Sequence, residues 1–365
     1  MRVVQLVPSL DVGGAERMAA LLALQLRTLG HDAALVSCYD PTGSWIEQEL
    51  RAAGVPLRFL GKSKGFDRGL VPRLATALRE LRPDVLHTHL HLLPYALPAR
   101  ALGHRRARVV HTLHNLAEHE VEPPIRLFQH VAFRAGVTPV CIGDAVARSF
   151  ERTYRRPAGA VIPNGIPVAR HAPPSGARAA VRAELGIDDA RPLFLTAGRL
   201  NAQKNQALLV RAFADPALAH ATLCIAGEGE LRDALERQAA EAGRDIRFLG
   251  VRRDLPRWMG AADAFVLPSD WEGNPLVVME AMAAGLAVIA TAVGCVPELV
   301  TEETGFLVPK GDARALAGVL ARGAAAPGTL HARGAAGARV ARERLDVSVM
   351  ATSYVAVYAS VMGGR

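Results

Sequence analysis

The stretch LFLTAGRLNAQKN, at residues 193–205, contains the pattern on which the fold prediction rests. An apolar run of strand length is followed by a glycine, then a polar loop, and then a helical stretch. Short apolar runs alternate in this way with amphipathic helical stretches along almost the whole chain. That alternation is typical of parallel sheets covered by helices on both faces, so we predict a doubly wound α/β protein.

The apolar runs form two series, separated by RHAPPSG at residues 170–176, whose prolines and glycine indicate a linker. The first series is VVQLV (3–7), AALVSC (33–38), VPLRFL (55–60), DVLHTH (84–89), RVVHTL (108–113), TPVCIG (138–143) and AVIPNG (160–165). The second is LFLTAG (193–198), TLCIAG (222–227), IRFLG (246–250), AFVLPS (264–269), LAVIATAV (286–293) and GFLV (305–308). Because 365 residues exceed the usual size of one core, we predict two domains, at 1–168 and 169–345.

Composition excludes several classes of protein. The four cysteines form no C-x-x-C pair, and no signal peptide precedes them, so we expect a reducing, cytoplasmic location rather than a disulfide framework. The sequence contains no run of about 18 uninterrupted apolar residues, so we expect no membrane-spanning helix. The net charge of +8 lies entirely within residues 1–170, and aromatic residues are only 5% of the chain, which disfavours a nucleic-acid binder. The basic stretch at 96–110 suggests peripheral contact with an anionic membrane at its inner face, and a basic solvated surface is the alternative.

Ligands of doubly wound sheets bind beyond the carboxyl ends of the strands, so we examined the residues that follow each apolar run. Arg199 and Lys204 follow the first run of the second series, and a guanidinium with an ammonium can clamp a diphosphate. Two solvated surface charges are the alternative. Gly13 and Gly14 follow the first run of the chain and open a helix, which predicts either a phosphate or sugar contact or a tight turn.

The stretch DWEGNPLVVMEAMAAG, at residues 270–285, carries two acidic residues in an otherwise apolar segment. We predict a short helix with Asn274 as its N-cap, Pro275 in its first turn and Gly285 after its end. Glu272 then lies just before the helix and Glu280 in its second turn, with free amides between them. Carboxylates suit sugar hydroxyls and helix amides suit phosphate oxygens, so this arrangement fits a nucleotide sugar. The alternatives are a dipole-stabilising acid at 272 and a surface or paired glutamate at 280.

Nine of the twelve histidines precede residue 131. His87, His89 and His91 alternate and can share one face of a strand, which raises the question of a metal site; no carboxylate or cysteine at suitable spacing completes one. His111 falls within the run RVVHTL and His114 just beyond it. His114 is therefore the better candidate for proton handling or phosphate contact, with a structural histidine as the alternative.

Taken together, these motifs resemble the retaining, family-4 type nucleotide-sugar glycosyltransferases of the GT-B superfamily (glycosyl transferases group 1). The resemblance is carried by GGAER (13–17), HTLHN (111–115), IPNGI (162–166), GRLNAQKN (198–205), AGEGELR (226–232), FLG (248–250), LPSDWEGNPLVVMEAMAAG (267–285) and VPELV with TGFLVP (296–309). It implies two Rossmann-like domains facing across a cleft. The N-terminal domain would be the acceptor side and the C-terminal domain would bind the donor. A helix at about 346–362 would pack back on the first domain.

The resemblance also implies roles for individual residues. Glu272 and His114 would act at the reacting centre, and Glu280 would bind the ribose hydroxyls. Arg199 and Lys204 would hold the donor diphosphate, and the main chain near Val251 would meet the base. The remaining donor contacts would come from the main chain of Gly273, Asn274, Pro275, Leu276 and Val277, and from Gly13 and Gly14 of the other domain. Cys295 stands where the family often has glycine, and Asn274 where it often has another residue; both departures bear on donor choice.

The implied reaction is transfer of a hexose from a nucleoside-diphosphate sugar, with a UDP-sugar favoured, to a hydroxyl of a glycan or lipid-linked acceptor in cell-surface polysaccharide or glycoconjugate synthesis. No D-x-D triplet occurs, so we expect neither a metal nor a cofactor. The alternatives are a sugar-nucleotide epimerase, a phosphorylase, or a catalytically inactive nucleotide-sugar-binding protein. Nothing in the sequence indicates the oligomeric state.

Overall fold

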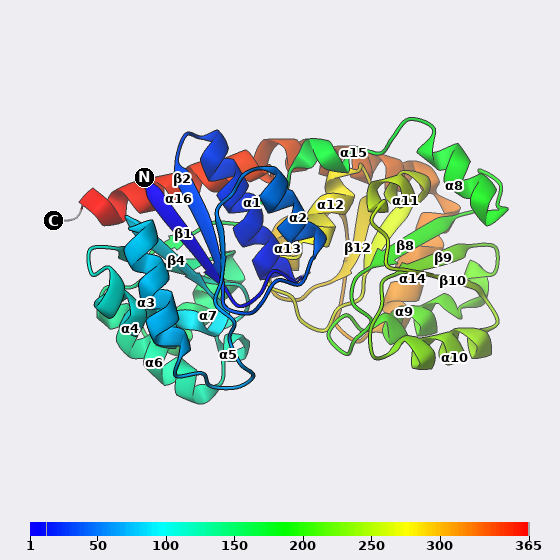
Figure 1. The fold of residues 1–365 in the computed structure, drawn as a ribbon. Coiled ribbons are helices and arrows are strands. Elements are labelled where there is room, and N and C mark those ends of the chain that lie inside the picture. The colour runs from blue at the N-terminus through cyan, green and yellow to red at the C-terminus, as the bar shows by residue number, and fades with distance from the viewer. Residues whose placement is uncertain (12, 364–365) are drawn as a thin grey trace. The chain divides into compact units, whose positions relative to one another are not determined.

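The computed structural model describes residues 1–11 and 13–363, and it contains two compact α/β units (Figure 1). The N-terminal unit consists of Met1–Ile166 together with the chain from Val347 onward, and the C-terminal unit is Pro167–Asp346. Both boundaries lie within two residues of those expected from the apolar runs. The helix α16 (Val347–Gly363), expected to pack on the N-terminal domain, belongs to the N-terminal unit.

The N-terminal unit is built on a seven-stranded parallel sheet with the order β3-β2-β1-β4-β5-β6-β7. The strands are β1 (Arg2–Val7), β2 (Asp32–Ser37), β3 (Leu57–Phe59), β4 (Val85–His89), β5 (Arg108–Leu113), β6 (Thr138–Cys141) and β7 (Ala160–Val161). The helices before residue 167 are α1 (Gly14–Thr28), α2 (Trp45–Ala52), α3 (Leu70–Leu81), α4 (Leu93–Gly103), α5 (Ala117–Glu120), α6 (Pro123–Arg134) and α7 (Asp144–Tyr154), with a 3-10 turn η1 (Leu90–Leu92).

Side-chain alternation along β1 gives this unit a core on each face of its sheet. Val3 packs in a cluster with α1 and α16, whereas Val4 and Leu6 pack in a second cluster with α3 and α4. Successive residues of a strand point to opposite faces, so a run that is apolar at every position requires helices on both sides. The unbroken apolar runs of the sequence therefore account for the three-layer architecture.

The C-terminal unit is built on a six-stranded parallel sheet with the order β10-β9-β8-β11-β12-β13. The strands are β8 (Leu193–Ala197), β9 (Thr222–Ala226), β10 (Asp245–Gly250), β11 (Ala264–Leu267), β12 (Ala287–Thr291) and β13 (Gly305–Val308). The helical segments are η2 (Val168–His171), α8 (Ala177–Leu185), α9 (Gln206–Phe213), η3 (Pro216–Leu218), α10 (Arg232–Ala242), α11 (Leu255–Ala261), α12 (Leu276–Ala283), α13 (Val296–Leu299), α14 (Ala313–Ala325) and α15 (Pro327–Arg344). All thirteen predicted runs are thus strands, and the predicted fold class is confirmed.

The strand order in each sheet reverses once. In the N-terminal unit the chain adds β2 and β3 on one side of β1 and then continues with β4 on the other side, and β8 and β11 make the same switch in the C-terminal unit. Ligands of doubly wound sheets bind beyond the carboxyl ends of the strands at this switch point. The loops that follow β1, β4, β8 and β11 are therefore where the structure directs the search for a site.

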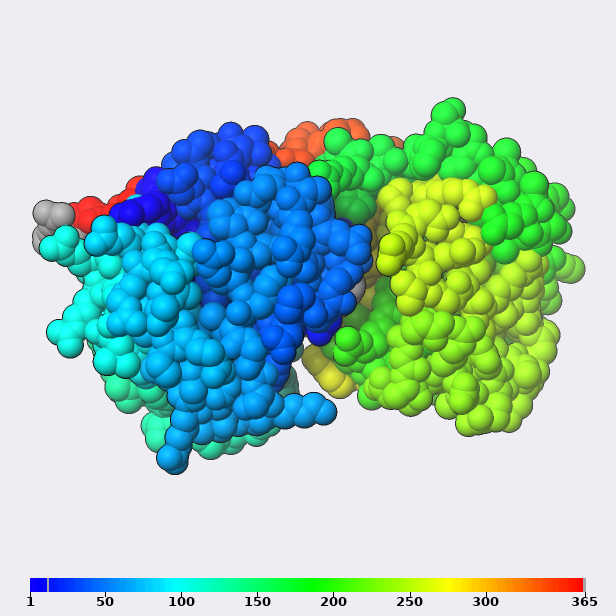
Figure 2. All heavy atoms as spheres, viewed as in Figure 1, coloured from blue at the N-terminus to red at the C-terminus, as the bar shows by residue number. Residues whose placement is uncertain are grey.

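The space-filling view shows which parts of the chain form one face of each unit (Figure 2). On the face in view, the N-terminal unit is formed largely by blue residues of the α2–α3 part of the chain. The C-terminal unit is formed there largely by green to yellow-green residues of the α9–α11 part. All five residues of β8 and five of the six residues of β1 are buried. The strands thus serve as scaffold, and their ends carry the accessible polar groups.

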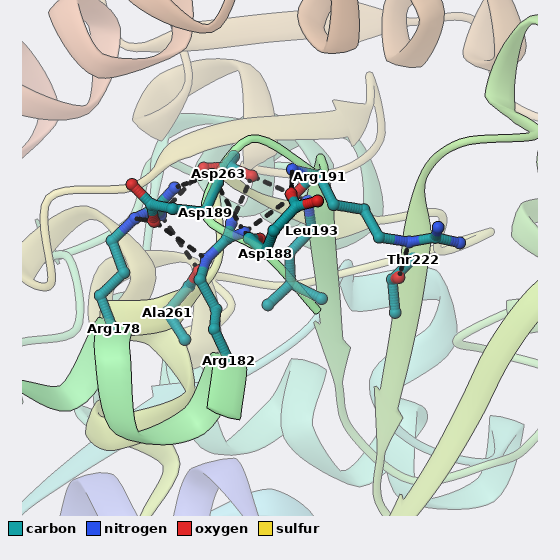
Figure 3. Close-up of polar contacts among 9 residues, drawn as sticks. All are labelled: Arg178, Arg182, Asp188, Asp189, Arg191, Leu193, Thr222, Ala261 and Asp263. Atoms are coloured by element: carbon teal, nitrogen blue, oxygen red, sulfur yellow. Dashed lines mark hydrogen bonds and ion pairs between the residues drawn. The ribbon is translucent and has the colours of Figure 1, made fainter. Parts of the chain in front are cut away.

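The amino ends of the central strands of the C-terminal unit are held by a buried ion-pair network (Figure 3). Asp263, which precedes β11, accepts hydrogen bonds from Arg182 and Arg178 of α8 at 2.9 and 3.0 Å, and from the backbone N–H of Leu193 at 2.7 Å. Arg182 and Asp263 are both nearly inaccessible to solvent. A buried pair of this kind is stable only when further hydrogen bonds satisfy both partners, and Leu193 and Arg178 supply them for Asp263.

Two local predictions are wrong. The helix α12 begins at Leu276, and Asn274 does not cap it, because Pro275 has an extended conformation (φ −73°, ψ 114°) and itself occupies the cap position. His91 does not share a strand face with His87 and His89. The strand β4 ends at His89, since Leu90 adopts a left-handed conformation (φ 55°) that turns the chain into η1.

Candidate active site

In the C-terminal unit, several hydrogen bonds join the loop that follows β8 to the loop that follows β11. Gln203 accepts a hydrogen bond from the backbone N–H of Asp270 at 2.8 Å, and its side chain donates to the carbonyl of Trp271 at 3.0 Å. Asn205 donates to the Asp270 carboxylate at 3.0 Å. These contacts bring QKN at 203–205 against DWE at 270–272, although 65 or more residues separate the members of each pair.

Lys204 and Glu272 form the central pair of this junction. The Lys204 ammonium Nζ lies 2.5 Å from Glu272 Oε1, and the Ser269 hydroxyl donates to the same oxygen at 2.6 Å. Ser269 is held in turn, because its carbonyl accepts a hydrogen bond from the Thr291 hydroxyl at 2.5 Å. Both donors converge on Oε1, and none of the residues that the structure describes bonds Oε2. A buried carboxylate with one oxygen fixed and one available can accept a hydrogen bond from a ligand hydroxyl.

The loop after β12 determines where Glu272 sits. Gly294 has φ +53°, and a Cβ at this position would lie 1.8 Å from the carbonyl oxygen of Glu272. The next residue, Cys295, donates its backbone N–H to the carbonyl of Gly273 at 3.1 Å. Gly294 and Cys295 therefore support the segment that precedes α12. Sequence reasoning noted Cys295 only as a departure from a resemblance, and the signal it lacked was the close approach of two backbones.

Glycines also let the loops after β8 and β9 lie against each other. A Cβ at Gly227 would lie 1.9 Å from the carbonyl oxygen of Gly198, and one at Gly229 would lie 2.2 Å from that of Leu200. Between these contacts, the backbone N–H of Leu200 donates to the carbonyl of Glu228 at 2.9 Å. The main chain on either side of Arg199 is consequently fixed. Its side chain is exposed and has no partner within the described residues.

The remaining predicted donor residues of this unit fall at the same edge of the sheet. Glu280 lies in the second turn of α12 and is only 4% exposed. Gly273 through Leu276 are buried and Val277 is partly exposed. Val251 follows β10 and is 69% exposed; β10 is two strands from β8, about 10 Å at the usual strand spacing.

In the N-terminal unit, His114 lies directly beyond β5, as predicted. Its backbone N–H donates to Glu120 Oε1 at 3.1 Å, and its Nε2 lies 2.9 Å from Nδ1 of His89. Burial lowers the pKa of His114 from 6.5 to about 3, so the ring is neutral at pH 7. Burial also raises the pKa of Glu120 to about 7, although the backbone N–H groups of His114 and Asn115 oppose this shift.

The two histidines of β4, His87 and His89, are hydrogen-bonded within the protein. Both ring nitrogens of His87 are 2.7 Å from hydroxyls, those of Tyr358 and Thr112. Both ring nitrogens of His89 are also engaged, with Gln5 and His114. In residues 1–11 and 13–363, no group of three or more His, Cys, Asp or Glu side chains is placed to hold a metal ion. Hydrogen bonding thus accounts for the clustering that raised the metal question.

Gly13 is the N-cap of α1 and Gly14 its first residue. The Glu16 carboxylate lies over Gly13, since a Cβ there would be 2.1 Å from Glu16 Oε2, whereas Gly14 has open space around it. A pocket of about 430 Å³, which sequence reasoning did not identify, lies at α5 and α6 of the same unit and is lined by His91, Glu118, Glu120 and Arg126 among others. No motif indicated it, because its lining comes from a loop and two helix ends.

Two doubly wound units, with parallel sheets of seven and six strands, place the structure in the GT-B fold class. A family model described as "Glycosyl transferases group 1" matches residues 191–324, and one described as "Glycosyltransferase Family 4" matches residues 12–170. The chain belongs to this family of glycosyltransferases, the group 1, family 4 type.

Individual relatives agree with the family. The chain is 33% identical over 233 residues to the lipopolysaccharide core biosynthesis mannosyltransferase LpsB of Rhizobium meliloti (strain 1021), a match that spans 60% of this chain and 66% of the relative. It is 30% identical over 292 residues to the corresponding LpcC of Rhizobium leguminosarum bv. viciae, spanning 73% and 81%. In structure it is similar to Anabaena HepE in complex with UDP-glucose, with a TM-score of 0.86, 22% identity, and coverage of 98% of this chain and 99% of that one. None of the described helices is long and apolar enough to cross a membrane.

Proposed function

We propose that the protein transfers a hexosyl group, with retained anomeric configuration, from a nucleoside-diphosphate sugar to a hydroxyl of a glycan or lipid-linked acceptor, in cell-surface polysaccharide or glycoconjugate synthesis. The observation that carries this proposal is the Lys204–Glu272 pair, fixed at 2.5 Å where the loops beyond β8 and β11 meet. An ammonium for phosphate and a carboxylate with one available oxygen for a sugar hydroxyl stand side by side there.

The proposed reaction breaks the bond between the anomeric carbon and the diphosphate, and the leaving diphosphate takes the electron pair. The acceptor oxygen bonds the anomeric carbon and passes its proton to the diphosphate oxygen that leaves. Negative charge therefore develops on the diphosphate, and Arg199, Lys204 and the first-turn amides of α12 are the groups that would stabilise it. Preorganised charges of this kind usually make the greatest single contribution to catalysis.

The remaining residues of the proposed site are assigned the following roles. Glu280 would accept hydrogen bonds from the ribose hydroxyls, and the main chain at Val251 would meet the base. Glu272 would contact the transferred sugar through Oε2. We propose Gly13, Gly14 and His114 of the N-terminal unit as further substrate contacts. We propose that Arg199, Lys204 and the first-turn amides of α12 neutralise the diphosphate without a metal ion or a cofactor.

Binding and turnover measurements test this proposal. We expect Lys204→Ala and Glu280→Ala to weaken donor binding and Glu272→Ala to lower turnover. Lys310→Ala is the matched control, since Lys310 is an exposed lysine of the same unit outside the site. Unchanged kinetics in all three site variants, with a donor known to bind, would contradict the assignment.

A binding experiment on the same protein can identify the donor nucleotide. We propose a UDP-sugar, which the HepE complex with UDP-glucose supports; the names of LpsB and LpcC favour a mannosyl donor. A thermal-shift screen of UDP, GDP, UDP-glucose and GDP-mannose separates them, because the nucleotide that binds the folded state raises the melting temperature. A larger shift with GDP-mannose would replace the UDP part of the proposal.

Products separate the alternative functions. A phosphorylase would form a sugar phosphate from inorganic phosphate, an epimerase would change the sugar without an acceptor, and an inactive binding protein would form neither.

We also propose peripheral contact of the basic stretch 96–110 with anionic lipid. In this stretch Leu102 is 64% exposed at the end of α4. Failure to bind anionic vesicles at low salt would contradict that part.

A further inference from the structure

A continuous chain of hydrogen bonds inside the N-terminal unit ends at His114. Tyr358 of α16 lies 3.3 Å from Nε2 of Gln5, and Gln5 Oε1 lies 2.8 Å from Nε2 of His89. His89 Nδ1 lies 2.9 Å from Nε2 of His114. Gln5, His89 and Tyr358 are fully buried, so water does not compete for these bonds. The chain links β1, β4, the loop after β5 and the C-terminal helix.

The direction of each bond follows from the chemistry of the groups. A neutral imidazole has one N–H donor and one acceptor nitrogen, and an amide oxygen only accepts. His89 must therefore donate from Nε2 to Gln5 Oε1, which leaves its Nδ1 as an acceptor. The facing nitrogen of His114, Nε2, must then carry the proton. The second nitrogen of His114, Nδ1, is left as an acceptor and has no hydrogen-bond partner within the described residues.

Tyr358 joins the Gln5 amide to His87. The Gln5 NH₂ group donates to the Tyr358 oxygen, so the Tyr358 hydroxyl can donate to Nδ1 of His87, 2.7 Å away. His87 then carries its proton on Nε2 and donates to Thr112, also at 2.7 Å. Each of these three hydrogen bonds then has one donor and one acceptor. Burial lowers the pKa of His87 and His89 well below 6.5, which keeps both rings neutral and the alternation intact.

We propose that Gln5, His89 and Tyr358 are positioning residues that hold His114 in the tautomer protonated at Nε2, so that its Nδ1 accepts a hydrogen bond from a hydroxyl of a sugar substrate. The substrate part rests on the proposed function, and the tautomer part does not. The opposite arrangement, with the Gln5 amide reversed, would place a proton on His114 Nδ1. His114 would then offer a donor and would not suit a hydroxyl that must donate. The polarity of the nitrogen offered to substrate thus follows from the orientation of the Gln5 amide, whose NH₂ group bonds Tyr358 of the C-terminal helix.

Nitrogen NMR of the full chain with ¹⁵N-labelled histidine tests the tautomer directly. His114→Gln assigns the signals, and the two-bond proton correlations distinguish a protonated ring nitrogen from an unprotonated one. We expect Nε2 of His114 to be protonated and Nδ1 unprotonated in the unliganded protein. Protonation at Nδ1 in the wild type would overturn the proposal.

Two variants test the chain that fixes the tautomer. Gln5→Met removes the acceptor for His89, and Tyr358→Phe removes the hydroxyl that accepts from the Gln5 NH₂ group while retaining the ring. We expect both to move the Nδ1 signal of His114 toward the protonated position. Thr88→Val is the matched control, because Thr88 is a buried hydroxyl that pairs with His111 at 2.8 Å and not with this chain. Wild-type His114 signals in both variants would overturn the proposal, even if their melting temperatures fell.

Kinetics then test the substrate part. Loss of one neutral hydrogen bond predicts a rise in KM for one substrate of about threefold to tenfold in Gln5→Met and Tyr358→Phe, with a smaller change in kcat. Thr88→Val is expected to leave KM unchanged. An unchanged KM in variants whose His114 tautomer has shifted would overturn the hydroxyl contact. A wild-type tautomer as expected, in a protein that transfers no sugar, would instead contradict only the proposed function.

Discussion

Gly294 supports Glu272 through close backbone packing. Glu272 depends on two donors to one carboxylate oxygen and also on the carbonyl of its own peptide, against which Gly294 packs. At residue 294, φ is +53° and a Cβ would lie only 1.8 Å from that carbonyl oxygen, so only glycine fits without movement. The neighbouring loop must therefore shift if any side chain is added there.

Gly294→Ala is expected to lower turnover, because the new methyl group would displace Glu272. Displacement of a catalytic group by about 1 Å can cost about 100-fold in rate. Gly285→Ala is the matched control: Gly285 also has positive φ (+82°), but nothing lies within 4 Å of its Cβ position. Both variants carry the left-handed backbone cost of about 1–2 kcal/mol, so their difference in kcat reports the clash at Glu272. Equal kcat in the two variants would contradict this role.

Single residues were the hardest features to predict from the sequence. Lys204 and Glu272 were each identified as ligand groups, but their pairing joins residues 68 apart and no periodic pattern records it. Asn274 was assigned to a helix cap because Asn favours caps, and the extended Pro275 overrides that preference. The hydrogen bond between Gln5 and Tyr358 spans 353 residues, so local sequence carries no signal for it.

At the scale of elements, the hydrogen bonds of Asp263 hold α8 to the amino ends of β8 and β11 (Figure 3). This network lies at the opposite edge of the sheet from Lys204 and Glu272. It can therefore be perturbed without contact with the proposed donor site, and it separates stability from function.

Asp263→Asn is expected to lower the free energy of unfolding of the C-terminal unit by about 3–5 kcal/mol, because it leaves the buried Arg182 without its counter-ion. Asp189→Asn is the control. Asp189 pairs with Arg178 and, at 3.6 Å, with Arg182, but it is 79% exposed, and a pair with an exposed partner contributes at most about 1 kcal/mol. Urea unfolding followed by donor binding to the folded fraction measures both effects. A loss of donor affinity without a loss of stability in Asp263→Asn would contradict this assignment.

Elements were the features that the sequence predicted best. Thirteen apolar runs gave thirteen strands, because a parallel strand covered on both faces must be apolar along its length, as β8 is. The strand ends were less certain: AVIPNG at 160–165 yields only the two-residue β7. Where a strand stops depends on backbone conformations such as that of Leu90, which residue type does not reveal.

At the scale of the whole molecule, we expect acid to change the folding stability of the two units differently. His87, His89, His111 and His114 all have lowered pKa values in the N-terminal unit, about 3 for the last two. Below about pH 6.5 the unfolded chain binds protons at these residues and the folded unit does not. The stabilisation from neutral histidines is therefore present above pH 6.5 and is lost as the pH falls.

Glu120 acts in the opposite direction. Its pKa is raised from 4.5 to about 7, so its contribution is fully present below pH 4.5 and is lost as the pH rises to about 7. Each group contributes at most about 1.4 kcal/mol per pH unit, and four histidines outnumber one carboxyl group. We expect the N-terminal unit to lose stability between pH 6.5 and 5.

Hydrogen exchange at pH 7 and pH 5 measures the two units separately within one protein. Faster exchange of β1, β4 and β5 at pH 5, after correction for intrinsic rates, is the expected result. The C-terminal unit, which has three of the twelve histidines, serves as the internal reference. Equal loss of protection in both units would contradict a role for the histidine cluster.

The N-terminal unit is assembled from two distant pieces of chain, which has a consequence for synthesis on the ribosome. Residues 1–166 leave the exit tunnel first, yet Tyr354 and Tyr358, which complete their core and their hydrogen bonds, are added only after the whole C-terminal unit has been translated. The C-terminal unit is continuous and can fold as soon as it emerges. The later half of the nascent chain is therefore expected to reach its native state before the earlier half, which must wait, with part of its apolar surface exposed, for α16.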